Sequence, residues 1–80
     1  MNINLLADQL LNVIYNNENI FEDGKKIGEE IYKTNGAKGL FSVMNIIEAE
    51  ILNCEYSSEY LSKLRELEWS WCGITPEWQA

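Results

Sequence analysis

The spacing of apolar residues along the chain predicts four helices and no strand. Apolar positions recur every three or four residues in four segments, and no segment shows the strict alternation of a half-buried strand. The four segments cover approximately 3–15, 20–33, 37–53 and 57–72. Asn35-Gly36 separates the second from the third, because glycine readily adopts the left-handed conformation that ends a helix. We therefore expect an all-α, compact four-helix domain.

Two glycines lie on the apolar face of the second segment. Gly24 and Gly28 are about one turn apart, and each costs a helix roughly 1 kcal/mol relative to alanine. A tolerated weakness would explain them. The absence of a Cβ also allows another helix to approach closely, and we favour this second interpretation.

The third segment is apolar around most of its circumference. Its main stripe consists of Leu40, Met44, Ile47 and Ile51, widened by Phe41 and Leu52 on one side and by Val43 and Ile46 on the other. A helix of this kind needs cover on nearly all sides. We expect it both to lie at the centre of the domain and to contribute to self-association, with Phe41, Val43 and Ile46 as candidate interface residues.

Trp69, Trp71 and Trp78 all lie close to the C-terminus. Trp69 and Trp71 are about 200° apart on a helix, so they cannot share a face. Trp71 fits the apolar stripe of the fourth segment, which leaves Trp69 facing elsewhere. We expect a C-terminal tail that packs back on the helices through Trp78 and covers Trp69. The alternative is that Trp69 and Trp78 form a binding surface, since indoles are common anchors of interfaces.

Residues 67–78, with the sequence LEWSWCGITPEW, resemble a C-terminal signature of small helical proteins from bacteria and their phages. The signature is approximately LExxWxGIxxW, and Gly39 followed by an apolar helix is similar to a second feature of that group. This chain differs by one extra residue before Trp78 and by Cys72, where an acidic residue is usual. The resemblance implies no activity. It implies structural roles for Trp71, Gly73 and Trp78.

The charge balance restricts the classes of partner. The 80 residues form one expected domain, 1–80, with 13 acidic and 6 basic residues and a net charge of −7. We expect no direct nucleic-acid binding, because it needs clustered Lys and Arg. We also expect no membrane binding, because anionic membranes would repel the chain. We expect a cytoplasmic protein, because the chain begins without a basic region and has no apolar run long enough to cross a membrane. The acidic charge serves either solubility or a basic partner.

The chain lacks most residues on which enzymes depend. It contains no histidine, so it has no Ser–His or Cys–His pair. Cys54 and Cys72 form no CxxC motif and cannot complete a zinc site, so we expect two free thiols. We therefore assign no catalytic, cofactor-binding or metal-binding residue.

One enzymatic alternative uses carboxylate-bound Mg²⁺. Glu29-Glu30 resembles the magnesium-binding helix of small all-α nucleotide pyrophosphatases, although a pair between Glu29 and Lys33 explains Glu29 equally well. The acids available for such a site are Glu29, Glu30, Glu48 and Glu50.

The pattern as a whole predicts a small acidic protein–protein interaction module that self-associates. The first alternative is a phage or mobile-element inhibitor that mimics nucleic acid in a nucleic-acid-binding or defence protein. The second is the Mg²⁺-dependent enzyme. The candidate interaction residues are Trp69, Trp78, Phe41, Val43, Ile46, Glu22, Asp23, Glu29, Glu59 and Glu66. Phosphate mimicry would also use Glu18 and Glu55.

Overall fold

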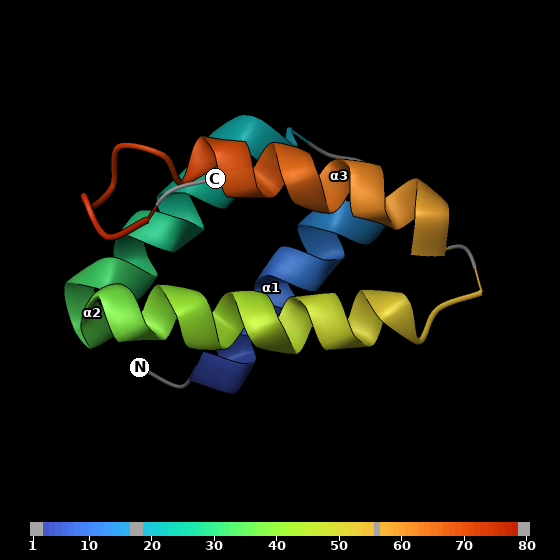
Figure 1. Ribbon diagram of the computed structural model, residues 1–80, viewed down its shortest axis with the longest axis horizontal. Helices are drawn as coiled ribbons and strands as arrows, with labels where there is room; N and C mark the ends of the chain where they lie inside the picture. The colour runs from blue at the N-terminus through green and yellow to red at the C-terminus, as the bar shows by residue number, and fades with distance from the viewer. Residues whose placement is uncertain (1–2, 17–18, 56, 79–80) are drawn as a thin grey trace.

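The computed structural model describes residues 3–16, 19–55 and 57–78. Within these ranges the chain forms three helices and no strand: α1 (Ile3–Tyr15), α2 (Ile20–Leu52) and α3 (Ser57–Ser70) (Figure 1). The all-α prediction is confirmed. The prediction of four helices is wrong, because the second and third predicted helices are parts of the single helix α2.

Helix α2 bends sharply at Gly36, the residue at which the sequence predicted a helix end. Gly36 has φ 71° and ψ −170°, and the φ lies in the left-handed region that favours glycine. The chain changes direction at this one residue and becomes helical again without an intervening loop. Figure 1 shows two arms pointing in different directions, which we call the first arm (20–35) and the second arm (37–52) of α2.

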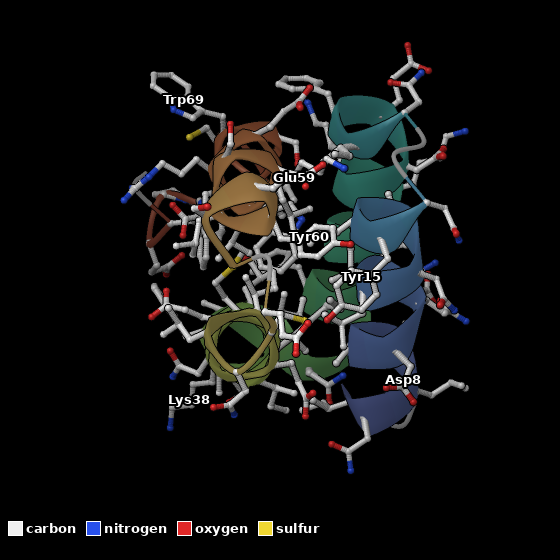
Figure 2. The ribbon with its side chains drawn as sticks, turned by 90° about the vertical axis from the view of Figure 1, so that its right-hand side faces the viewer. Asp8, Tyr15, Lys38, Glu59, Tyr60 and Trp69 are labelled. Carbon is white, nitrogen blue, oxygen red and sulfur yellow. The ribbon has the colours of Figure 1, made fainter. Side chains whose placement is uncertain are left out.

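The two arms of α2, together with α1 and α3, enclose one core. Seen from the end in Figure 2, α3 lies above the second arm, and α1 lies beside them next to the first arm. The fully buried large residues are Leu6, Leu10, Ile14, Ile31, Leu40, Val43, Ile47, Ile51, Leu67 and Trp71. Five of these ten come from α2, one from the first arm (Ile31) and four from the second (Leu40, Val43, Ile47 and Ile51), so both arms contribute to the core.

Helix α3 packs directly on the backbone of the first arm at the two glycines. A Cβ on Gly28 would lie 2.6 Å from Cδ1 and 2.8 Å from Cε2 of Trp71, and a Cβ on Gly24 would overlap the side chain of Leu67. Trp71 Nε1 donates a hydrogen bond to the Gly24 carbonyl oxygen over 2.8 Å. The close approach predicted from the glycines is therefore confirmed.

The C-terminal tail packs back on the helices, as the sequence predicted. Gly73, with φ 95°, reverses the chain after α3, and the Ile74 N–H donates to the Trp71 carbonyl. Trp78 is 7% exposed, its Nε1 donates to the Glu68 carbonyl over 3.0 Å, and its ring centre lies 4.9 Å from that of Trp71 and 5.1 Å from that of Phe41. The tail thus closes one side of a small core.

Candidate interaction surface

Trp69 differs from the other two tryptophans in both burial and hydrogen bonding. Its side chain is 66% exposed, whereas Trp71 and Trp78 are buried. Trp71 and Trp78 each donate their indole N–H to a backbone carbonyl, but Trp69 Nε1 makes no hydrogen bond within the described ranges. The expectation that the tail covers Trp69 is wrong, because Trp78 packs instead against Trp71 and Phe41.

Trp69 belongs to an exposed ridge on α3. Glu59, Ser62, Glu66 and Trp69 are all exposed, and successive members are three or four residues apart, which places them on one side of a helix. Figure 2 shows Trp69 projecting to the upper left of α3 and Glu59 to the right of its near end, while the second arm of α2 passes below α3. The ridge therefore faces away from the second arm.

The first arm of α2 contributes a second exposed strip. Phe21, Glu22, Lys25 and Glu29 line one shallow depression together with Lys26, and Phe21 is 47% exposed. Asp23 lies instead beside α1, in a depression shared with Gln9 and Asn12. Of the predicted acids on this arm, Glu22 and Glu29 are therefore on the same strip, and Asp23 is on another.

The strip and the ridge lie on two helices that touch each other. A Cβ on Gly24 would lie 3.4 Å from Ser70 Oγ, and the two helices run in the same direction at this contact, since Gly24 faces Leu67 and Gly28 faces Trp71. Phe21 lies about one turn before Gly24 on α2, and Glu66 lies about one turn before Ser70 on α3. We call the combined surface the α2–α3 face. It consists of Phe21, Glu22, Lys25, Glu29, Glu59, Ser62, Glu66 and Trp69.

The carboxylates of the α2–α3 face have no partner among the residues that the structure describes. Glu22, Glu29, Glu59 and Glu66 form neither an ion pair nor a side-chain hydrogen bond within the part of the chain that the structure describes. The pair between Glu29 and Lys33, which was one explanation of Glu29, does not form among the described residues. Four carboxylates accompany two lysines, because Lys26 lines the same depression as Lys25, so the net charge of this surface is negative and its acids are free to bind an external cation.

The apolar residues predicted for self-association are largely used inside the molecule. Val43 is fully buried and Ile46 is partly buried, because α1 and α3 cover the second arm. Phe41 keeps 46% of its surface exposed but packs against Trp78. The second arm is therefore central, as expected, and the large apolar side chains that it leaves exposed are Phe41 and Leu52.

The acids considered for Mg²⁺ do not assemble into a site. Glu29 and Glu30 lie on the first arm, and Glu48 and Glu50 lie on the second. Among the described residues, no three side chains of His, Cys, Asp or Glu are grouped closely enough to hold a metal ion. Glu18 lies outside the described residues, and Glu55 follows the end of α2.

A polar aromatic cluster at one end of the molecule was not predicted. Tyr15 Oη lies 3.6 Å from Cys54 Sγ, and the Tyr15 and Tyr60 rings pack edge-on at 4.9 Å (Figure 2). The hydrogen bond with Cys54, then burial and nearby negative charge, raise the pKa of Tyr15 to about 12. Lys63 Nζ lies 5.3 Å from the centre of the Tyr60 ring. Tyr15 and Cys54 are 39 residues apart, so helical spacing gives no signal for this contact.

Comparison with known proteins identifies no relative: no family model, no curated protein and no solved structure matches the chain. No helix in the described ranges has both the length and the apolar character needed to cross a membrane.

Proposed function

We propose that this chain is a small acidic binding protein that docks a protein partner on the α2–α3 face, with Trp69 as the anchor. The observation that carries the proposal is the state of Trp69, which is 66% exposed and has no hydrogen bond, while the fold buries both other indoles. An unpaired, exposed indole beside unpaired carboxylates is typical of a surface that becomes buried in a complex.

The exposed part of Trp69 is large enough to matter energetically. An aromatic side chain buries about 150–250 Å² when fully covered, and apolar burial contributes roughly 25 cal/mol per Å². Covering the exposed two thirds of Trp69 would therefore contribute about 2–4 kcal/mol to binding. That is the range of an interface hot spot.

Binding is a better explanation of the surface than catalysis. The sequence contains no histidine, and the carboxylates of the α2–α3 face lie on its open surface, where water would screen any charge they stabilise. We place the protein in the cytoplasm, because Cys54 and Cys72 are free thiols.

Mimicry of nucleic acid is a second candidate, and the carboxylate spacing favours it less. Glu22 and Glu29 are seven residues apart, as are Glu59 and Glu66, which corresponds to about 10.5 Å along each helix. Phosphates along one DNA strand follow one another every 3.4 Å or so along the axis. The face therefore carries charge too sparsely to reproduce a strand, although it remains attractive to a basic protein surface.

Quantitative affinity capture from the native cells tests the proposal. The wild-type chain is compared with Trp69→Ala and with the matched control Leu5→Ala, which removes a half-exposed side chain from α1. We expect at least one protein to be retained by the wild type and by Leu5→Ala and to be lost with Trp69→Ala. Equal recovery with all three chains would contradict a role for Trp69, and competition of the retained protein by duplex DNA would support mimicry.

A further inference from the structure

The geometry points to a specific class of occupant for the α2–α3 face: a basic amphipathic helix that lies along α3, placing Lys or Arg beside Glu59 and Glu66 and an apolar side chain on Trp69. This inference rests on the proposed function and adds the chemistry of the partner. It assigns the face neither to a second copy of the chain nor to nucleic acid.

The ridge on α3 has a length and a spacing of side chains that suit the binding of a partner helix. Glu59, Ser62, Glu66 and Trp69 span about 15 Å along the helix axis, close to three turns. Ser62 lies at the middle of the ridge, and its small side chain allows the backbone of a partner helix to approach there. A partner helix would meet the four positions at its own spacing of three and four residues, which is the usual pattern of helix recognition.

The charges determine the sign of the partner. Glu59 and Glu66 lie on the ridge, and Glu22 and Glu29 line the adjoining strip of α2, all without internal ion pairs. A helix with Lys or Arg seven residues apart would meet both acids of the ridge at once. An uncharged apolar helix that covered Trp69 would remove water from these carboxylates without supplying an opposite charge. The cost of that desolvation disfavours an apolar partner.

A second copy of the chain is disfavoured by the same charges. Each copy carries a net charge of −7, and two α2–α3 faces would bring eight carboxylates together against four lysines, Lys25 and Lys26 of each copy. Like charges placed opposite one another at an interface oppose association. A basic partner is instead attracted at long range, and its association should weaken as salt increases.

The three indole N–H signals of the uniformly ¹⁵N-labelled protein provide the test. The probe is an amphipathic helical peptide built from leucine and lysine, and the comparison peptide replaces lysine with glutamate. Trp69 is assigned by the signal that disappears in Trp69→Phe. With the lysine peptide we expect the Trp69 signal to move in a saturable manner while the buried Trp71 and Trp78 signals stay nearly fixed, and we expect no effect from the glutamate peptide.

Charge-matched variants distinguish this site from general attraction to an acidic protein. Glu59→Gln/Glu66→Gln should weaken binding by about two- to thirtyfold, the combined range of two exposed ion pairs. Glu48→Gln/Glu50→Gln removes the same charge from the second arm and should leave the affinity within about twofold. Equal effects of the two double variants, or a lysine peptide that leaves the Trp69 signal unmoved, would overturn the assignment of a basic helix. The proposed function is tested separately by affinity capture, and it fails if the same proteins are recovered with and without Trp69.

Discussion

The contact between α2 and α3 makes a prediction whose sign is opposite to the usual rule for helices. Replacing a glycine inside a helix with alanine ordinarily stabilises it by about 1 kcal/mol. At Gly28 the new Cβ would lie 2.6 Å from Trp71 Cδ1, well inside the usual carbon–carbon contact distance of about 3.5–4.0 Å. Trp71 is a rigid, fully buried ring, so either the ring or α3 itself would have to move.

The expected net effect of Gly28→Ala is destabilisation. Overpacking costs about 1–3 kcal/mol, and disturbing the buried hydrogen bond from Trp71 to Gly24 adds about 1–3 kcal/mol. Subtracting the gain in helix propensity leaves a loss of about 1–5 kcal/mol in the free energy of unfolding. For a domain of this size, that lowers Tm by at least about 4 °C.

Urea and thermal unfolding, followed by circular dichroism, measure the effect. Asn45→Ala, an exposed change on the second arm, controls for helix propensity. Gly24→Ala should cost less than Gly28→Ala, because the Leu67 methyl group it meets can rotate whereas an indole cannot. Trp71→Phe should offset part of the Gly28→Ala loss by removing ring atoms. A Gly28→Ala protein at least as stable as wild type would refute the described packing.

Three further predictions concern the tail, one tyrosine and the thiols. Trp78→Ala should reduce the free energy of unfolding by about 3–5 kcal/mol, as for other buried tryptophans. Trp69→Ala should change it by less than about 0.5 kcal/mol, because Trp69 is exposed. Similar losses for the two variants in urea unfolding would contradict the difference in their burial. Absorbance titration should show one tyrosine with a pKa near 12 that is absent from Tyr15→Phe. Because folding raises this pKa, protonated Tyr15 stabilises the folded state fully below about pH 10, and this contribution is lost as the pH rises toward 12. The free energy of unfolding of the wild type should therefore fall more steeply over this pH range than that of Tyr15→Phe. Alkylation of the unfolded chain without reductant should label both Cys54 and Cys72, and a labelling-resistant pair would show a disulfide.

Sequence patterns predicted the parts of the fold that depend on one helix at a time. The glycines at 24 and 28 indicated a close helix contact, and the stripe containing Trp71 indicated its burial, because both features are local to a single helix. The sharp change of direction was placed at Gly36 for the same reason. The pattern placed the start of the next helical segment at 37, but it did not show that residues 34 and 35 remain helical, so that two helical arms join directly at Gly36 without a loop.

The surface was predicted less well, because it depends on how helices lie beside one another. Helical spacing showed that Trp69 faces away from Trp71, but only the position of the tail decides whether Trp69 is covered. Helical spacing gave no signal for the exposure of Phe21, which depends on where α3 crosses α2. Val43 was assigned to an interface because the sequence does not show how much of the second arm the other helices cover.

Site-specific photo-crosslinking in the native cells tests the central claim most directly. A photoreactive amino acid replaces Ser62, at the middle of the exposed ridge of α3, or Leu5, exposed on α1. The account predicts a discrete crosslinked protein from position 62 that is absent from position 5 and is lost when Trp69→Ala is added. Crosslinks of equal intensity from both positions, or crosslinks from position 62 that persist without Trp69, would contradict the α2–α3 face as the binding surface.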